Sequence, residues 1–104
     1  MKIGIDILGG DFAPDANLGG VSLALKELPA DVILTCIGDE IQIKDSLSKF
    51  GIDSDRIEIV HAPDVITMHD HPTRAIPQKP NSSIAVGFDL LVKNEIDAFA
   101  STGN

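Results

Sequence analysis

Short runs of apolar residues alternate along this chain with longer segments in which apolar residues recur every three or four positions. The short runs are rich in Ile and Val, which is typical of buried strands in a parallel sheet. The longer segments are typical of helices that bury one face. The predicted strands are Lys2–Leu8, Asp31–Ile37, Arg56–His61 and Asp97–Ser101, and the predicted helices are Asp15–Leu28, Glu40–Phe50 and Ile84–Asn94.

Local signals support the helices. Pro29 ends the first one, because a proline inside a helix loses a backbone hydrogen bond and clashes with the preceding turn. Asp39 is a suitable N-cap for the second helix, and Gly51 is a suitable C-terminal stop. Gly19 and Gly20 lie inside the first helix, where each glycine costs roughly 1 kcal/mol relative to alanine. We interpret the pair as a place of close contact between helix and sheet.

The alternation of strands and helices predicts an α/β fold with a mostly parallel sheet and right-handed crossovers. Residues 62–80 contain four prolines and form a long irregular segment, which in a compact domain is more often functional than incidental. The chain stops at Ser101–Asn104, directly after a strand and where another loop-to-helix junction begins. We therefore expect residues 1–104 to be the N-terminal part of a single, larger α/β domain.

Composition narrows the classes of function. Eight basic residues against sixteen acidic ones give a net charge of −8, which argues against a general nucleic-acid binder, since such proteins neutralise phosphates with Lys and Arg. No apolar run approaches the roughly 20 residues that span a bilayer, and Asp6 interrupts the apolar stretch that a signal peptide needs. The single cysteine, Cys36, cannot build a disulfide framework, and we interpret it as a buried core residue. These features favour the cytosol.

Small polar residues gather where the predicted strands end. Because the carboxyl ends of parallel strands meet at one edge of a sheet, we expect the loops that begin at Gly9, Gly38, His61 and Ser101 to lie close together. Glycine lets a ligand approach the backbone, and the N-terminus of a helix attracts an anion. The sequence therefore predicts a phosphate-binding edge.

Each of these signals has a second interpretation. Gly9, Gly10 and Asp11 form either a phosphate-binding turn or an ordinary strand-to-helix turn that Asp11 caps. Ser82 and Ser83 either bind the anion or cap the third helix. The spacing of these residues alone does not decide between the two interpretations.

Several isolated titratable residues also have two possible interpretations. Asp6, in a strand, either braces backbone donors near the site or lies on an exposed face. Arg74 and Lys79 are either phosphate ligands or solvated surface charges. His61 is a general acid–base or a polar residue with a satisfied hydrogen bond, and we favour the second. Residues 69–71 read His-Asp-His, but no second ligand pair accompanies them, which favours an incidental contact over a metal site.

An ordered set of motifs runs through the whole chain. The motifs are Ile5-Asp6, Gly9-Gly10-Asp11 with Ala13-Pro14, Gly38-Asp39, residues 56–62, Met68, Pro72, Ala75, Lys79, Ser82-Ser83-Ile84, and Asp97-Ala98-Phe99 with Ser101, Gly103 and Asn104. Together they resemble the bacterial phosphate acyltransferase family, which makes acyl phosphate from acyl carrier protein for phospholipid synthesis. The chain departs from the family at Ile76–Pro80, where the family usually has a charged helical stretch and where Pro77 and Pro80 would break a helix.

The resemblance implies a Rossmann-like α/β/α architecture in a cytoplasmic homodimer that contacts the membrane peripherally through a portion outside residues 1–104. It also implies that inorganic phosphate attacks the thioester of acyl carrier protein without a metal or organic cofactor. Because phosphate is already an anion, the enzyme has to hold it near the carbonyl and stabilise the oxyanion. The catalytic candidates are Asp11, Lys79, Ser82 and Asn104, and the phosphate-binding candidates are Gly9, Gly10, Ser83, Ser101 and Gly103.

Two alternatives to this function stay open. One is an acetyl- or butyryl-phosphate transferase that uses coenzyme A thioesters, and the other is a non-enzymatic anion-binding α/β module. If the sheet is incomplete, we expect the 104-residue chain alone to be inactive. Acyl carrier protein is acidic and this chain carries a charge of −8, so a basic surface elsewhere has to attract it.

Overall fold

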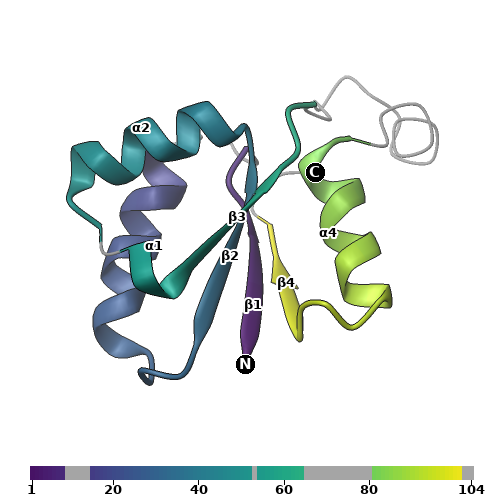
Figure 1. The fold of residues 1–104 in the computed structure, drawn as a ribbon, viewed down its shortest axis with the longest axis horizontal. Coiled ribbons are helices and arrows are strands. Elements are labelled where there is room, and N and C mark those ends of the chain that lie inside the picture. Colours follow the sequence, from purple (N-terminus) through teal and green to yellow (C-terminus); the bar gives the residue numbers. More distant parts are fainter. Residues whose placement is uncertain (9–14, 53, 65–80, 102–104) are drawn as a thin grey trace.

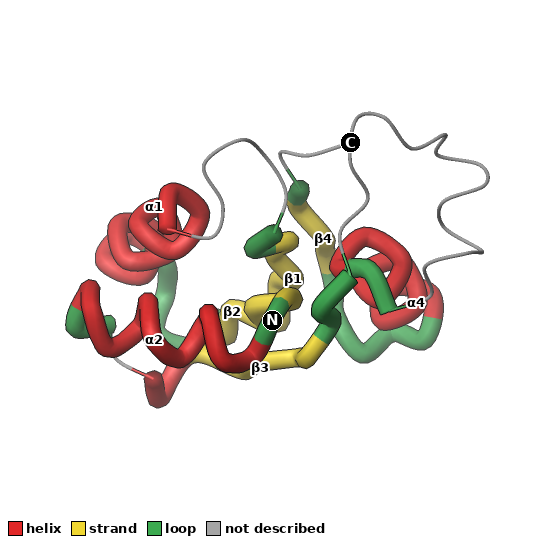
Figure 2. The backbone as a smooth tube through the Cα atoms, turned by 90° about the horizontal axis from the view of Figure 1, so that it is seen from above, coloured by secondary structure: helices red, strands yellow, loops and turns green. Residues whose placement is uncertain are grey.

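The computed structural model describes residues 1–8, 15–52, 54–64 and 81–101. In chain order the elements are β1 (Lys2–Asp6), α1 (Asp15–Glu27), β2 (Ile33–Gly38), α2 (Glu40–Phe50), a 3-10 helix (Ser54–Arg56), β3 (Ile57–His61), α4 (Ser83–Val92) and β4 (Ala98–Ala100). They form three layers, in which α1 and α2 cover one face of the sheet and α4 covers the other (Figures 1 and 2).

The sheet is parallel throughout, with the strand order β3-β2-β1-β4. In β1, one of the two interior strands, Ile3 is in register with Leu34 of β2 and with Ala98 of β4. The α/β, Rossmann-like fold class is therefore confirmed. All four strands end at the same edge, which is the upper edge in Figure 1.

The larger part of the core lies between the sheet and the α1–α2 layer. Leu18 and Val21 of α1 and Ile43 and Leu47 of α2 pack there against Ile7 and the buried side chains of β2. Cys36 of β2 is fully buried in this core, as the sequence predicts, and its burial raises the pKa of the thiol to about 12. A thiol in this environment stays protonated at neutral pH.

Close contact between a helix and the sheet occurs on the other face. A Cβ atom added at Gly87 of α4 would collide with the ring of Phe99 in β4. By contrast, a Cβ atom at Gly19 or Gly20 would meet no described atom within 4 Å. Our interpretation of these two glycines as a contact point is therefore wrong. The reason is that Leu18 and Val21 carry the buried stripe of α1, which leaves the two positions between them away from the sheet.

The predicted helix signals act as caps. The Asp39 carboxylate accepts hydrogen bonds from the backbone N–H groups of Ile41 (3.0 Å) and Gln42 (3.2 Å). Gly51 follows α2 with a φ of 62°, the left-handed conformation that suits glycine. Both predictions for the ends of α2 are confirmed.

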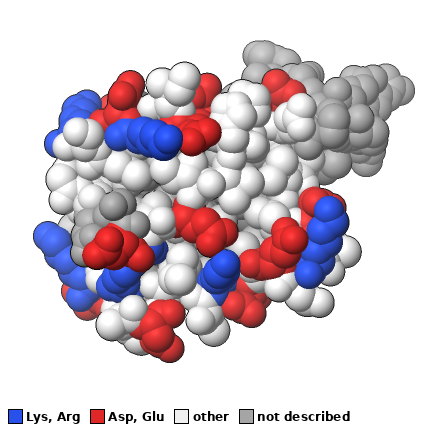
Figure 3. All heavy atoms as spheres, viewed as in Figure 1, with Lys and Arg blue, Asp and Glu red and all other residues white. Residues whose placement is uncertain are grey.

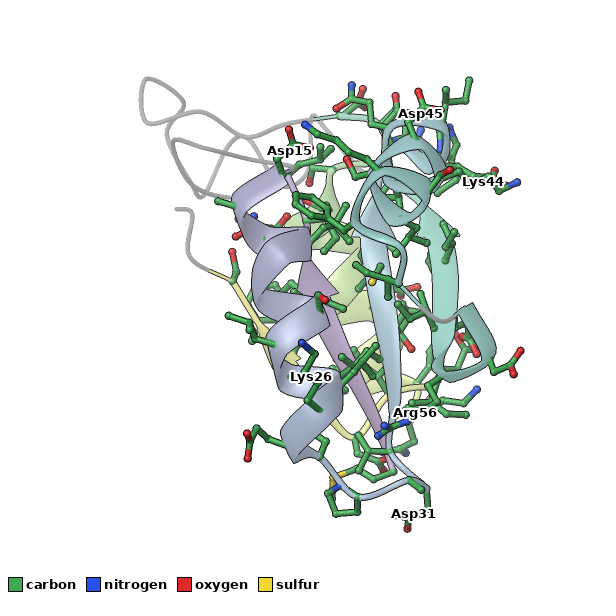
Figure 4. All side chains as sticks on the ribbon, turned by 90° about the vertical axis from the view of Figure 1, so that its left-hand side faces the viewer. Asp15, Lys26, Asp31, Lys44, Asp45 and Arg56 are labelled. Atoms are coloured by element: carbon green, nitrogen blue, oxygen red, sulfur yellow. The ribbon has the colours of Figure 1, made fainter. Side chains whose placement is uncertain are left out.

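The end of α1 depends on a residue that the sequence did not single out. The Arg56 guanidinium donates hydrogen bonds to backbone carbonyl oxygens at and just after the C-terminus of α1, those of Leu25 (2.9 Å) and Pro29 (2.5 Å) among them. It also reaches the carbonyl oxygen of Val32, just before β2. Figure 4 shows Arg56 near the lower end of α1, far from Asp15 at the upper end. Arg56 thus replaces the partners that helix carbonyls lose at a C-terminus.

Candidate functional site

The site centres on the carboxylate of Asp6, the last residue of β1. Asp6 is only 2% exposed, which excludes an exposed face and confirms the alternative that it braces donors at the strand end. Its Oδ1 atom accepts a hydrogen bond from the backbone N–H of Leu8 (3.0 Å). This contact turns the chain at the end of β1, which is why the strand stops two residues before the predicted boundary.

Two serines donate to the same carboxylate from distant parts of the sequence. The Ser83 hydroxyl, in the first turn of α4, donates to Asp6 Oδ1 (2.5 Å). The Ser101 hydroxyl, directly after β4, donates to Asp6 Oδ2 (2.7 Å). The structure therefore brings together two residues that the sequence predicts to bind phosphate, and Asp6 is what holds them together.

Asn17 connects the first turn of α1 to the end of β1 by hydrogen bonds. Its side-chain amide donates hydrogen bonds to the backbone oxygens of Ile7 (2.9 Å) and, more weakly, Asp6 (3.4 Å). The sequence analysis missed Asn17. A polar residue in the first turn after a strand–loop junction was the only signal available, and asparagine is common in such positions for purely local reasons.

Ser82 is the N-cap of α4. Its side-chain oxygen accepts a hydrogen bond from the backbone N–H of Ala85 (3.2 Å), and the residue is fully buried. Its backbone pairs with Asp64 in an isolated parallel bridge, and the Ser83 N–H donates to the Asp64 carbonyl oxygen (3.3 Å). The capping interpretation of Ser82 is thus confirmed, whereas its catalytic role stays a prediction.

His61 lies at the end of β3 and has a structural partner. Its Nδ1 atom accepts a hydrogen bond from the backbone N–H of Glu40 at the start of α2 (3.1 Å). This contact is consistent with the favoured interpretation of a polar residue whose hydrogen bond is satisfied. The next residue, Ala62, is fully buried, and its N–H donates to the Gly38 carbonyl oxygen (2.7 Å).

Several predicted site residues lie outside the described residues, so their predictions stand without structural comment. These are Gly9, Gly10, Asp11, Arg74, Lys79, Gly103, Asn104 and the His-Asp-His segment 69–71. Within the described ranges no group of three His, Cys, Asp or Glu side chains is arranged to hold a metal ion.

A hollow of about 630 Å³ lies at the opposite edge of the sheet from Asp6. It opens beside the amino ends of β1 and β4, and Asp97 there accepts a hydrogen bond from the backbone N–H of Lys2 (2.8 Å). None of the predicted site residues that the structure describes lines it. Its residues are Met1, Lys2, Glu58, Val60, Leu90, Asn94, Glu95, Ile96 and Asp97.

Charges of both signs alternate over the visible surface. On the face in Figure 3 the described residues show no continuous basic patch. Several lysines are instead engaged in exposed ion pairs, which contribute little energy individually. The pairs are Lys2–Glu58, Lys44–Glu40, Lys49–Asp15 and Lys93–Asp89.

Comparison with known proteins identifies the family. The model of a family described as "Fatty acid synthesis protein" matches residues 1–104. This chain belongs to that family. Among curated relatives, the phosphate acyltransferases of Acetivibrio thermocellus, Dictyoglomus turgidum and Clostridioides difficile are 46%, 41% and 39% identical to it over 104 residues. Each alignment covers 100% of this chain and 30% of the relative, so the chain spans less than a third of the length of these relatives.

In this member of the fatty acid synthesis protein family, the arrangement around Asp6 is of a kind that can bind an anion. Three elements meet there: the end of β1, the end of β4 and the N-terminus of α4. The N-terminus of a helix carries partial positive charge, and in α4 two of its backbone N–H groups, those of Ser83 and Ala85, already donate to Asp64 and Ser82. Such an edge can hold a small anion next to a second substrate.

Proposed function

We propose that the full-length protein transfers a fatty acyl group from acyl carrier protein to inorganic phosphate and so makes acyl phosphate for phospholipid synthesis. Membership of the fatty acid synthesis family and the names of the curated relatives support an acyltransferase that uses phosphate. The observation that carries the proposal is the meeting of Ser83, Ser101 and the N-terminus of α4 at Asp6. Phosphate binding is a function that this edge of a Rossmann-like sheet commonly serves.

The proposed reaction is a single acyl transfer. An oxygen of phosphate attacks the thioester carbonyl carbon, and the carbonyl electron pair moves onto its oxygen. When the tetrahedral intermediate collapses, the C–S bond breaks and its electron pair leaves with the thiolate of the carrier. The nucleophile is already charged, so the protein's task is to position it and to stabilise the oxyanion.

Residues on the neighbouring loops complete the proposal. Backbone N–H groups of Gly9, Gly10 and Gly103 would hold the phosphate, and Lys79 would offset its charge. Asn104 and Ser82 would lie near the carbonyl, and Asp11 would orient Lys79 instead of touching the anion, because a carboxylate repels phosphate. No metal or organic cofactor takes part in this scheme.

The proposal extends to the setting of the enzyme. We place it in the cytoplasm as a homodimer with peripheral membrane contact. Among the described helices none is long and apolar enough to cross a bilayer. Residues 1–104 carry a net charge of −8, so the acidic carrier would dock on a basic surface elsewhere in the full-length protein.

An assay with two acyl donors tests this function. Full-length protein is incubated with phosphate and either an acyl-carrier thioester or the matching acyl-coenzyme A, and acyl phosphate and free thiol are measured. We expect both products from the carrier thioester, and neither product when phosphate is left out. Turnover of acyl-coenzyme A with none of the carrier thioester would instead establish the coenzyme A-dependent transferase. Phosphate binding without turnover of either donor would establish the non-enzymatic module.

A further inference from the structure

We propose that β4 is an inner strand of the sheet in the full-length protein, and that the portion following residue 104 covers its open side. In this arrangement a connecting helix packs on the exposed flank of α4, and a fifth strand, parallel to β4, pairs with the outer backbone of β4. The inference concerns the fold of the full-length protein and goes beyond the proposed acyl transfer, on which it does not depend.

The outer backbone of β4 offers hydrogen bonds to a further strand. β4 is the last strand in the order β3-β2-β1-β4, so the described residues supply a neighbour on one side only, β1. The Asp97 N–H donates to the Lys2 carbonyl oxygen of β1. Because the backbone groups of successive strand residues point to opposite sides, Phe99 also points toward β1, whereas the N–H and C=O groups of Ala98 and Ala100 point away from it. Both alanines are exposed.

The two outer strands of the described sheet differ in composition. β3 carries the charge of Glu58 within the strand, and Pro63 lies just beyond its end. Charged residues and proline are features that protect a permanent sheet edge from further pairing. β4 reads Ala-Phe-Ala, with no charge or proline within the strand. The composition therefore favours growth of the sheet beside β4, with β3 as the permanent edge.

Helix α4 is apolar over more of its circumference than one sheet face can cover. Its ten residues include a single charged one, Asp89. On one flank, Leu90 lines the hollow beside β3. On the other flank, Phe88 and Val92 lie one turn apart and are 50% and 81% exposed. A helix that is apolar nearly all round is typical of the interior of a larger protein.

The exposed flank of α4, formed by Phe88 and Val92, lies beside the open edge of β4. The Phe88 ring stands edge-to-face against the Phe99 ring of β4, with 5.6 Å between the ring centroids. Phe99 also packs against Gly87 of α4. The exposed flank is therefore continuous with the outer backbone of β4, and one helix–strand unit can cover both.

The handedness of the connections places the covering helix on this flank. The two connections that run from β1 through β2 to β3 carry α1 and α2 on one face of the sheet (Figure 2). The connection from β3 to β4 runs across the sheet in the opposite direction and carries α4 on the other face. Right-handed crossovers require this change of face with direction. A connection from β4 to a strand outside it keeps the second direction, so its helix lies on the α4 face, next to Phe88 and Val92.

The length of the relatives is sufficient for such a unit. A crossover between parallel strands needs roughly a dozen residues or more. This chain covers 30% of each aligned relative, so the portion that it leaves uncovered is more than twice as long as the chain itself. One helix and one strand take up a small part of that portion.

Photo-cross-linking in the full-length protein tests which segment covers the exposed flank. The photoreactive amino acid p-benzoylphenylalanine replaces Val92 or, as a matched control, Ile41, which is 72% exposed on α2. After irradiation the products are separated by mass, and the joined peptides are identified by mass spectrometry. We expect the protein with the probe at Val92 to form a cross-link within one chain, to a peptide that follows residue 104. The probe at Ile41 should not yield this product.

Residue-resolved hydrogen exchange of the full-length wild-type protein tests the pairing of β4. In a strand with two neighbours the amides of Ala98, Phe99 and Ala100 are all protected, whereas at an open edge only Phe99 is protected by β1. We expect Ala98 and Ala100 to exchange about 100-fold or more slowly than in an unstructured peptide, as hydrogen-bonded amides inside a folded domain do. Phe99 is the internal control.

Three outcomes would overturn the inference. Fast exchange at Ala98 and Ala100 beside a protected Phe99 would make β4 a true edge strand. A cross-link from position 92 to a second chain would assign the exposed flank to another copy of the protein. A cross-link to a peptide within residues 1–104, or none above the background of the Ile41 control, would leave no place for the covering helix. All of these readouts are independent of turnover, so failure of the acyl-transfer assay would not affect them.

Discussion

The Arg56 guanidinium lies 2.5 Å from the carbonyl oxygen of Pro29, the residue that stops the first helix. The two residues are 27 positions apart, and the same guanidinium also holds the carbonyl oxygens of Leu25 and Leu28. One side chain therefore satisfies the C-terminal end of α1 and ties it to the segment that leads into β3.

Replacing this side chain should destabilise the domain. In Arg56→Met the methylenes are largely kept but the donors are lost, so several partly buried carbonyl oxygens lose their partners. We expect a loss of about 2–3 kcal/mol in the free energy of unfolding. Chemical denaturation of the full-length protein measures it. Arg56→Lys should recover only part of the loss, since an ammonium group lacks the planar fork of donors. Equal stability of Arg56→Met and wild type would contradict this role.

The two classes of helix glycine should respond oppositely to alanine. Gly87→Ala places a methyl group against the Phe99 ring and should cost about 1–3 kcal/mol. Gly20→Ala adds a methyl group in open space on α1 and should gain about 0.5–1 kcal/mol, because alanine restricts the unfolded chain. The melting temperatures of the two variants, measured side by side, check the prediction. A stabilising Gly87→Ala would show that α4 moves away from the sheet at little cost.

Thr35 offers a stabilising substitution. The residue is fully buried in β2, and its hydroxyl has no hydrogen-bond partner among the described residues. Thr35→Val has the same shape without the unpaired hydroxyl, so we expect a gain of about 1 kcal/mol in the free energy of unfolding. Thr35→Ala is the control, and it should be destabilising because it leaves a cavity. If valine is no better than threonine, the hydroxyl has a partner in solution.

Asp15 should contribute to stability in a pH-dependent way. Hydrogen bonds from Ser46 and then Lys49 hold the pKa of the Asp15 carboxyl below its ordinary value of 3.8. A carboxyl with a depressed pKa in the folded state adds stability above its unfolded pKa, and that contribution is lost as the pH falls through the folded pKa. Asp15→Asn should therefore lower the melting temperature slightly at pH 7.

The difference between Asp15→Asn and wild type should begin to shrink below about pH 4, where the unfolded carboxyl titrates, and should be lost once the pH falls below the depressed pKa of the folded carboxyl. Melting temperatures between pH 2 and 7 would show the two curves converging (roughly the range over which carboxyls titrate). Asp45→Asn makes the same charge change on the exposed side of α2 and serves as control. A constant difference at every pH would mean that packing, not charge, accounts for the effect.

The periodicity of the sequence was enough to predict the fold, because each strand and helix carries its own pattern. Asp39 and Gly51 mark the two ends of α2 through contacts within a few residues, and such contacts can be recognised from the local sequence. Arg56 shows the limit of prediction from the local sequence. Its partners lie between 24 and 31 positions away, and nothing in its own neighbourhood distinguishes it from a surface arginine.

The site was predictable only as far as topology dictates it. Parallel strands require that Ser83 and Ser101 lie at one edge, and this part of the prediction is correct. The direction of their hydroxyl hydrogens depends on Asp6, for which the sequence left two alternatives. The prediction for Gly19 and Gly20 was wrong for a similar reason. A glycine in a helix has the same sequence signature whether it faces a sheet or open space.

The contacts of Asp6 also bear on the order in which the protein folds. Its two partners, Ser83 and Ser101, follow Asp6 by 77 and 95 residues in the sequence, so both contacts close very long loops. Loop closure of this length has a high entropic cost, and contacts distant in sequence slow folding. Helices α1 and α2 can pack on β1 and β2 before either serine arrives. The hydrogen bonds that join β1, α4 and the end of β4 are therefore expected to form late in folding, and under the proposed function anion binding would have to wait until β4 has joined the sheet.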